Sequence, residues 1–225
     1  MKRTPTRSLS KAPARRVPPS ARQRNKLDKR QRILTAAWHL FVSQGYDATT
    51  TKQIAHRAKI ASGTLFLYAS DKLDLLAMLF HDRLAHAVDE GFATLPTKAP
   101  LIDQLMHIFG SFFQMYGEEP ELSRRFVRQL LLVEGPNADR VNLLTVSFVA
   151  RLQGLLTVAE QQGRLQSQTP SVMLAQYLFG MYYMSLMSWV MGYATLETAV
   201  DPLLRQAFEL LLHGAYFSKQ TPQRP

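Results

Sequence analysis

The sequence predicts an all-α fold, with a small N-terminal helical domain followed by a larger C-terminal helical domain. Three observations lead to this prediction. Apolar residues recur at helical spacing along most of the chain, no stretch alternates with a period of two, and Pro and Gly punctuate the chain at intervals of one helix. We expect about nine helices in the 225 residues.

The first helix is expected from Leu27 to Gln44. Its apolar residues Ile33, Ala37, Leu40 and Phe41 lie at spacing i, i+4, i+7 and i+8, which places them on one face. The next residue is a glycine, which commonly ends a helix.

Two short helices follow, from Thr51 to Ala58 and from Ser62 to Tyr68, joined by a three-residue turn. Thr50 and Gln53 have the spacing of a capping box at the start of the first of them. The second presents short polar groups, a glycine and a tyrosine. This pattern is typical of a helix-turn-helix recognition element, whose small donors and acceptors read base edges.

The stretch from Lys29 to Leu76 resembles the N-terminal DNA-binding domain of the TetR (tetracycline-repressor) family of bacterial regulators. The resemblance rests on Ile-x-x-Ala-Ala-x-x-Leu-Phe from Ile33, then Gly45-Tyr46, Ala48-Thr49-Thr50, Gly63-Thr64-Leu65-Phe66 and Lys72. The chain departs from the family at three positions: Lys59 replaces a turn glycine, Ala61 a Ser or Thr cap, and Ala69 an aromatic residue.

The resemblance implies which residues contact DNA. The start of the second helix faces the duplex, the third lies in the major groove with its aromatic residue near base methyls or sugar, and a tyrosine and a lysine after it clamp phosphates. The implied contact residues are Thr50, Thr51, Lys52, Ser62, Gly63, Thr64, Phe66, Leu67, Tyr68 and Lys72.

Six further helices are expected in the C-terminal domain, separated by proline and glycine residues. They run from a cap at Ser70 or Asp71 to about Ala93, and then over about 101–116, 121–133, 139–162, 170–193 and 202–214.

The helix expected over 170–193 has no charged residue, and its segment Val172–Tyr193 is long enough to span a bilayer. Its serines, glycines and tyrosines dilute the hydrophobicity, and no Lys/Arg cluster adjoins it. A helix buried on two sides explains the pattern as well, and the resemblance implies that the last two helices form a four-helix bundle with a second subunit. The expected interface residues are Leu174, Leu178, Met181, Ser185, Leu204, Phe208 and Leu211.

Aromatic and methionine side chains are frequent in the middle helices. Such side chains line adaptable cavities, although for any single one of them an ordinary core position is the commoner explanation. Together with the resemblance, they predict a ligand pocket. A partly buried arginine there would have a role if the ligand were anionic, whereas such an arginine more often pairs with a local carboxylate or reaches solvent. The candidate pocket residues are Met106, Phe109, Phe113, Phe126, Arg128, Phe148, Arg151, Tyr177 and Met181.

The net charge of +10 is concentrated at the N-terminus. Residues 1–26 carry +9, residues 27–80 carry +3 and residues 81–225 carry −2, so a polyanionic partner is expected for the N-terminal part. The chain has no cysteine, no recognised catalytic motif and no metal-ligand pattern among its six histidines. We therefore expect no enzyme activity, no cofactor and no metal.

These observations predict a homodimeric, cytoplasmic and nucleoid-associated transcriptional repressor. It would bind a palindromic or near-palindromic double-stranded operator and be released by a small, largely apolar effector, without stable membrane insertion. The alternative is the same DNA-binding fold with a C-terminal domain that engages a protein or membrane partner. The expected organisation is a disordered basic arm (1–26), a DNA-binding domain (27–72), a regulatory and dimerisation domain (73–218) and a flexible tail (219–225).

Overall fold

The structure, a computed structural model, describes residues 20–130, 132 and 134–214, and this part of the chain is helical and contains no strand. The tail expected over 219–225 and most of the expected basic arm lie outside the described residues. The helices are α1 (Ala21–Gln44), α2 (Thr51–Arg57), α3 (Ser62–Leu65), α4 (Lys72–Ala93), α5 (Leu101–Gly117), α6 (Pro120–Gln129), α7 (Pro136–Gln161), α8 (Ser171–Val190), α9 (Leu196–Thr198) and α10 (Arg205–Gly214).

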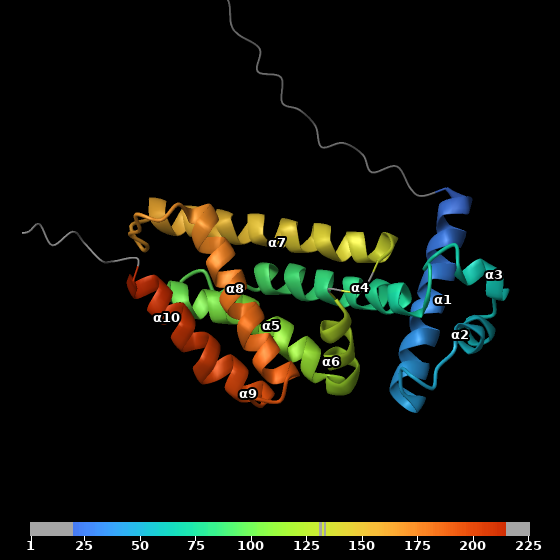
Figure 1. The fold of residues 1–225 in the computed structure, drawn as a ribbon. Helices are drawn as coiled ribbons and strands as arrows, with labels where there is room; N and C mark the ends of the chain where they lie inside the picture. Colours follow the sequence, from blue (N-terminus) through green and yellow to red (C-terminus); the bar gives the residue numbers. More distant parts are fainter. Residues whose placement is uncertain (1–19, 131, 133, 215–225) are drawn as a thin grey trace, which may run out of the picture.

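Helix α1 begins six residues earlier than the sequence pattern predicted. Ser20 is its N-cap, and Ser20 and Gln23 form a capping box that satisfies backbone donors at the helix start. Residues 21–26, which were expected to belong to a disordered arm, are therefore helical. They extend α1 beyond the rest of the N-terminal domain (Figure 1).

The helix-turn-helix forms where the sequence predicted it. Thr50 and Gln53 make the expected capping box at the start of α2. Lys59 adopts φ 54°, so the turn takes the left-handed conformation with a side chain in place of the usual glycine. Ala61 is the N-cap of α3 and offers no side-chain hydrogen bond, which agrees with a weakened cap.

Helix α4 joins the two domains. Its residues from Asp74 to Phe80 are all buried, because α4 packs against α1 on one side and against α5, α6 and α7 on the others. Two side-chain contacts strengthen the junction with α1: Arg30 pairs with Asp82 at 2.8 Å, and the Arg83 guanidinium lies 4.1 Å from the Trp38 ring. Helix α4 therefore connects the C-terminal bundle directly to the DNA-binding domain.

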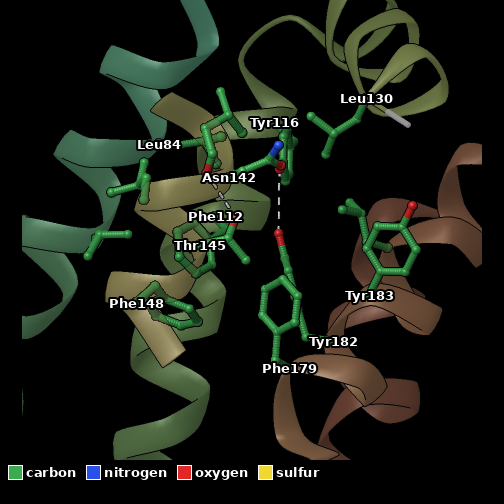
Figure 2. Close-up of a pocket in the computed structure, with 14 residues that line it drawn as sticks. Leu84, Phe112, Tyr116, Leu130, Asn142, Thr145, Phe148, Phe179, Tyr182 and Tyr183 are labelled. Atoms are coloured by element: carbon green, nitrogen blue, oxygen red, sulfur yellow. Dashed lines mark hydrogen bonds between the residues drawn. The ribbon is translucent and has the colours of Figure 1, made fainter. Parts of the chain in front are cut away.

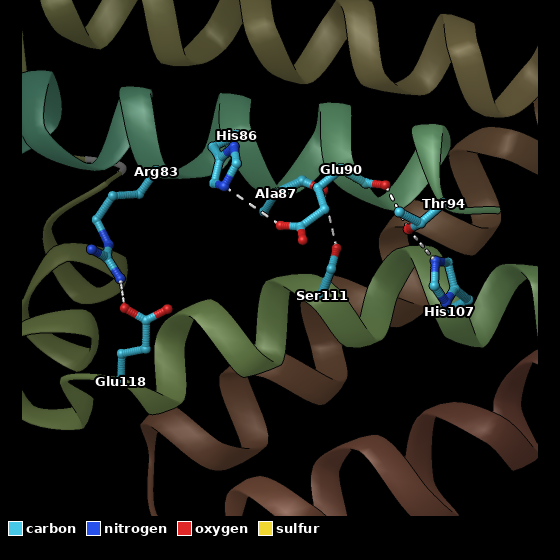
Figure 3. A network of polar contacts seen from close by, with 8 residues as sticks. All are labelled: Arg83, His86, Ala87, Glu90, Thr94, His107, Ser111 and Glu118. Atoms are coloured by element: carbon cyan, nitrogen blue, oxygen red, sulfur yellow. Dashed lines mark hydrogen bonds and ion pairs between the residues drawn. The ribbon is translucent and has the colours of Figure 1, made fainter.

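The C-terminal domain is a bundle in which α4 and α7 run side by side and α5, α8 and α10 complete the core (Figure 1). Gly91 allows α5 to approach α4, since a Cβ there would lie 3.1 Å from the Ser111 hydroxyl. Polar pairs line the groove between these two helices, including Arg83 with Glu118 and Thr94 with His107 (Figure 3). These side chains are engaged with one another across the groove.

The last predicted helix, over 202–214, is longer and less regular than expected. It begins as α9, passes through an irregular turn at Ala199–Leu204 (η1) in which Asp201 is extended, and continues as α10.

The helix that could cross a membrane is not the one that the sequence suggested. Among the described residues, α7 rather than α8 is long and apolar enough to do so by length and composition. Helix α7 packs against α4 and α8 in this structure.

We predict that Lys59→Gly raises the free energy of unfolding by about 0.5–1 kcal/mol, because the left-handed backbone costs a side-chain-bearing residue energy that glycine avoids. Lys52→Gly, the same change inside α2, should lower it by about 1 kcal/mol. Thermal unfolding of both variants measures the difference. A lower melting temperature for Lys59→Gly would contradict this account of the turn.

Candidate DNA interface and ligand pocket

The recognition helix α3 buries one apolar side chain, half-buries Thr64 and exposes its first two residues. Leu65 is fully buried, while Ser62 and Gly63 are exposed. Phe66 and Leu67, which follow directly, are 51% and 80% exposed. Large apolar side chains left open beside polar ones fit a surface that contacts a partner.

The start of α2 is also accessible. Lys52 is exposed and Thr51 is half-buried. The Thr50 hydroxyl accepts the Gln53 backbone N–H at 3.2 Å, so it serves first to cap the helix. These positions agree with the predicted contact surface, and the contacts themselves remain predictions.

The N-terminal extension of α1 lies beside the end of the recognition segment. The Tyr68 hydroxyl donates to the Lys26 carbonyl at 3.4 Å. Arg22, Lys26 and Lys29 surround a hollow of about 680 Å³ next to Tyr68 and Leu67. The sequence assigned Arg22 and Lys26 to a disordered arm and did not place their charges here. The Ser20–Gln23 spacing is the sequence signal that could have predicted this helical extension, because it is that of a capping box.

Lys72 has a different environment from the one predicted. Its ammonium donates to the backbone carbonyls of Tyr46 and Thr49 at 3.0 Å and of Asp47 at 3.3 Å, and it lies 4.4 Å from the Tyr46 ring. An ammonium has three donors, so these bonds occupy it. Lys72 therefore closes the loop between α1 and α2, and its phosphate contact stays a prediction.

A pocket of about 290 Å³ opens in the C-terminal domain between α4, α5, α7 and α8 (Figure 2). Aliphatic and aromatic side chains form most of its wall. Asn142, Thr145 and three tyrosines add uncharged polar groups, and no charged side chain lines it. The lining residues are Leu84, Val88, Phe112, Tyr116, Leu130, Val141, Asn142, Leu144, Thr145, Phe148, Phe179, Tyr182, Tyr183 and Leu186.

Two tyrosines face each other across this pocket. The hydroxyls of Tyr182 and Tyr116 are 3.5 Å apart, a long and weak hydrogen bond (Figure 2). Burial raises the pKa of Tyr116 to about 12 and raises the pKa of Tyr182 well above 10. Both hydroxyls therefore stay protonated at neutral pH, and either can donate to a ligand oxygen.

Of the nine pocket residues expected from the sequence, Phe148 lines this pocket. Phe109 and Phe113 lie behind the pocket wall, with ring centroids 5.1 and 5.7 Å from Tyr182. Met106 borders the groove between α4 and α5 instead. Phe109 and Phe113 support the pocket wall through Tyr182 without lining the pocket.

Three further residues expected in the pocket contact other parts of the chain, and Tyr177 and Met181 lie on the outer face of α8. Phe126 stacks on Phe80 with ring centroids 4.2 Å apart. Arg128 donates to a backbone carbonyl at the end of α8, and Arg151 pairs with Asp89 at 2.7 Å. Neither arginine lines this pocket, and the Arg151–Asp89 pair matches the alternative in which such an arginine pairs with a local carboxylate.

Most residues expected at the dimer interface are buried inside the chain itself. Leu174, Leu178, Leu204 and Phe208 are core residues of this chain. Ser185 is also buried, and its hydroxyl donates to the Ala199 carbonyl. The outer face of α8 and α10 carries other side chains, with Met184 68% exposed. Three of the expected interface residues, Met181, Ser185 and Leu211, line the hollow on this face. Its lining residues are Gln176, Tyr177, Gly180, Met181, Met184, Ser185, Ser188, Leu203, Ala207 and Leu211.

Comparison with known proteins identifies relatives that cover most of this chain. Residues 33–79 match the family model described as bacterial regulatory proteins, tetR family. The fatty acid metabolism regulator protein of Bacillus subtilis is 24% identical over 195 residues, which cover 86% of this chain and 98% of that protein. The HTH-type transcriptional repressor BepR of Brucella suis is 24% identical over 84% of this chain and 87% of that protein.

Solved structures share the fold. Thermus thermophilus FadR, a TetR-family repressor crystallised with lauroyl-CoA, aligns with a TM-score of 0.66 at 24% identity over 87% of this chain and 99% of that chain. Bacillus subtilis FadR in complex with stearoyl-CoA aligns with a TM-score of 0.64 at 23% identity, covering 82% of this chain and 98% of that one.

Proposed function

Because this chain is a TetR-family transcriptional regulator and not an enzyme, we propose that it is a homodimeric repressor released from its operator by a small, largely apolar ligand. One observation carries the proposal. The exposed recognition helix is joined through the buried helix α4 to a pocket lined by apolar and uncharged polar groups. A ligand that moves α4 would change DNA affinity by the difference in its binding to the two states.

DNA binding is supported by the exposed faces of α2 and α3 and by the charge beside them. The α1 extension adds Arg22, Lys26 and Lys29 next to Tyr68. Cations on a helix that flanks a recognition element suit phosphate contacts, which position a protein without reading sequence. We propose that α3 reads the major groove while the α1 extension follows the adjacent backbone.

The pocket supports an aliphatic ligand with a hydrogen-bonding oxygen. Its volume of about 290 Å³ is at the lower end of small-molecule sites. Two related structures contain stearoyl-CoA and lauroyl-CoA. We propose that an acyl chain fills this pocket, with its carbonyl near Tyr116 and Tyr182, and that any charged head group stays outside, since no charged side chain lines the wall.

Assembly as a dimer is supported by the outer face of α8 and α10. Methionine, tyrosine and leucine side chains remain partly exposed there, around a hollow of about 610 Å³. Two copies that pack through this face would carry two recognition helices, which must lie ~34–36 Å apart to read successive major grooves. The operator would then be a palindrome or near-palindrome.

A second candidate function is contact of the C-terminal domain with a protein or membrane. Helix α7 favours it, because Leu143 and Val146 on its outer face are each 68% exposed and the helix is apolar enough to span a bilayer. Elution of the full chain as a defined species without detergent would exclude the membrane version.

We predict that the double variant Lys26→Ala/Lys29→Ala binds a selected operator less tightly and with a smaller salt dependence. The slope of log K against log salt should fall by about 0.9 for each phosphate contact removed. Lys98→Ala/Arg164→Ala removes the same charge far from the DNA-binding domain and should leave the slope unchanged. Titrations at several salt concentrations measure it, and equal slopes for both variants would argue against a phosphate contact by α1.

We predict that Met184→Glu gives monomers with very weak operator binding, because a charge would be buried in the interface. Val146→Glu is the matched control, since Val146 on α7 is equally exposed. Sedimentation at micromolar concentration compares the two. If the dimer persists with Met184→Glu and dissociates with Val146→Glu, the dimer interface lies on α7 and not on α8.

We predict that lauroyl-CoA raises the melting temperature and releases the operator. At a hundredfold excess over Kd, the stabilisation should be about 2.7 kcal/mol, which corresponds to roughly 5–10 °C for a chain of this size. Thr145→Trp, which fills the pocket, should abolish both effects. If lauroyl-CoA gives the same shift with Thr145→Trp, the ligand binds elsewhere.

A further inference from the structure

A buried carboxylate lies where the two domains meet. Asp74, in the first turn of α4, has no solvent exposure and takes part in none of the ion pairs among the described residues. It accepts three hydrogen bonds instead, from the Ser70 N–H at 2.9 Å, the Asn137 N–H at 2.9 Å and the Asn137 side-chain amide at 3.0 Å. These donors lie at the N-terminal ends of α4 and α7, where backbone dipoles favour negative charge.

This carboxylate replaces the missing cap of α7. The N-cap residue of α7 is Gly135, which has no side chain to satisfy the first backbone donors. Gly135 also adopts φ 123°, and a Cβ there would lie 2.9 Å from the Asp74 carboxyl and the Ser70 hydroxyl. A glycine is therefore needed at this position for the carboxylate of α4 to reach the end of α7.

Asn137 also contacts the segment that follows the recognition helix. Its side-chain nitrogen also donates to the Tyr68 carbonyl at 2.8 Å. Tyr68 lies three residues beyond the end of α3, so one amide group joins the DNA-binding segment, the buried carboxylate and the start of α7.

The next turns of α7 line the ligand pocket. Val141, Asn142, Thr145 and Phe148 form one wall of it, within three turns of Asn137. We infer that Asn137 and Asp74 are positioning residues that couple pocket occupancy to the recognition helix through α7, in addition to α4. This inference rests on the proposed function, since it requires that the protein bind DNA and that the pocket control it.

The first measurement is the operator affinity of the full chain with Asn137→Ala. This variant keeps the backbone donor to Asp74 and removes both side-chain bonds, to the Asp74 carboxylate and to the Tyr68 carbonyl, so it should weaken operator binding about tenfold. Ala159→Gly is the control, because it destabilises α7 at its far end without touching the junction. Its affinity should stay within about twofold of wild type.

The second measurement is a double-mutant cycle with Thr145→Trp, which occupies the pocket without added ligand. In the wild-type background Thr145→Trp should weaken operator binding about fivefold or more, and in the Asn137→Ala background less than about twofold. A residue that only stabilises the fold would leave the two effects independent. Asn137→Ser, which leaves a short polar side chain and adds no charge beside Asp74, replaces Asn137→Ala if the alanine variant does not fold.

Four results would overturn the inference. Either Asn137 variant could bind the operator as well as wild type, Thr145→Trp could have the same effect in both backgrounds, or it could have no effect in either. The fourth is a folded wild-type protein that binds no duplex, which also removes the proposed function. The first three results leave the proposed DNA-binding function intact.

Discussion

The arrangement of both domains depends on the burial of α4. Seven consecutive residues, Asp74 to Phe80, are removed from solvent, which requires neighbours on every side of the helix. Those neighbours are α1 from the DNA-binding domain and α5, α6 and α7 from the C-terminal domain. Because a packed core has few alternative arrangements, a displacement at one end of α4 must be accommodated at the other.

The sequence predicted the parts of the structure that depend on local patterns. The helix-turn-helix and the Thr50–Gln53 capping box both follow from residues close together in the chain. The all-helical fold was also confirmed. Local hydrogen bonding and periodicity determine these features, and both can be recognised in one segment at a time.

The candidate pocket and interface could not be predicted in the same way, because they depend on which helix covers which face. Leu178 and Phe208 were assigned to the dimer interface partly because they are apolar. The most apolar stripe of α8 and α10 instead packs into the core of the same chain. In the pocket, Asn142 and Thr145 carry no apolar signal at all. Their place in the wall follows from the crossing of α7 and α8, which is a tertiary property.

The two tryptophans lie where their fluorescence reports on two different sites of the molecule. Trp38 lies under the Arg83 guanidinium at the junction of the two domains, with 4.1 Å from the ring to the cation. Trp189 lies 4.9 Å from Arg124 and 6.3 Å from Tyr116, which lines the pocket. A cation over an indole ring perturbs its emission, so the two sites of the molecule can be followed separately by leaving one indole in place at a time.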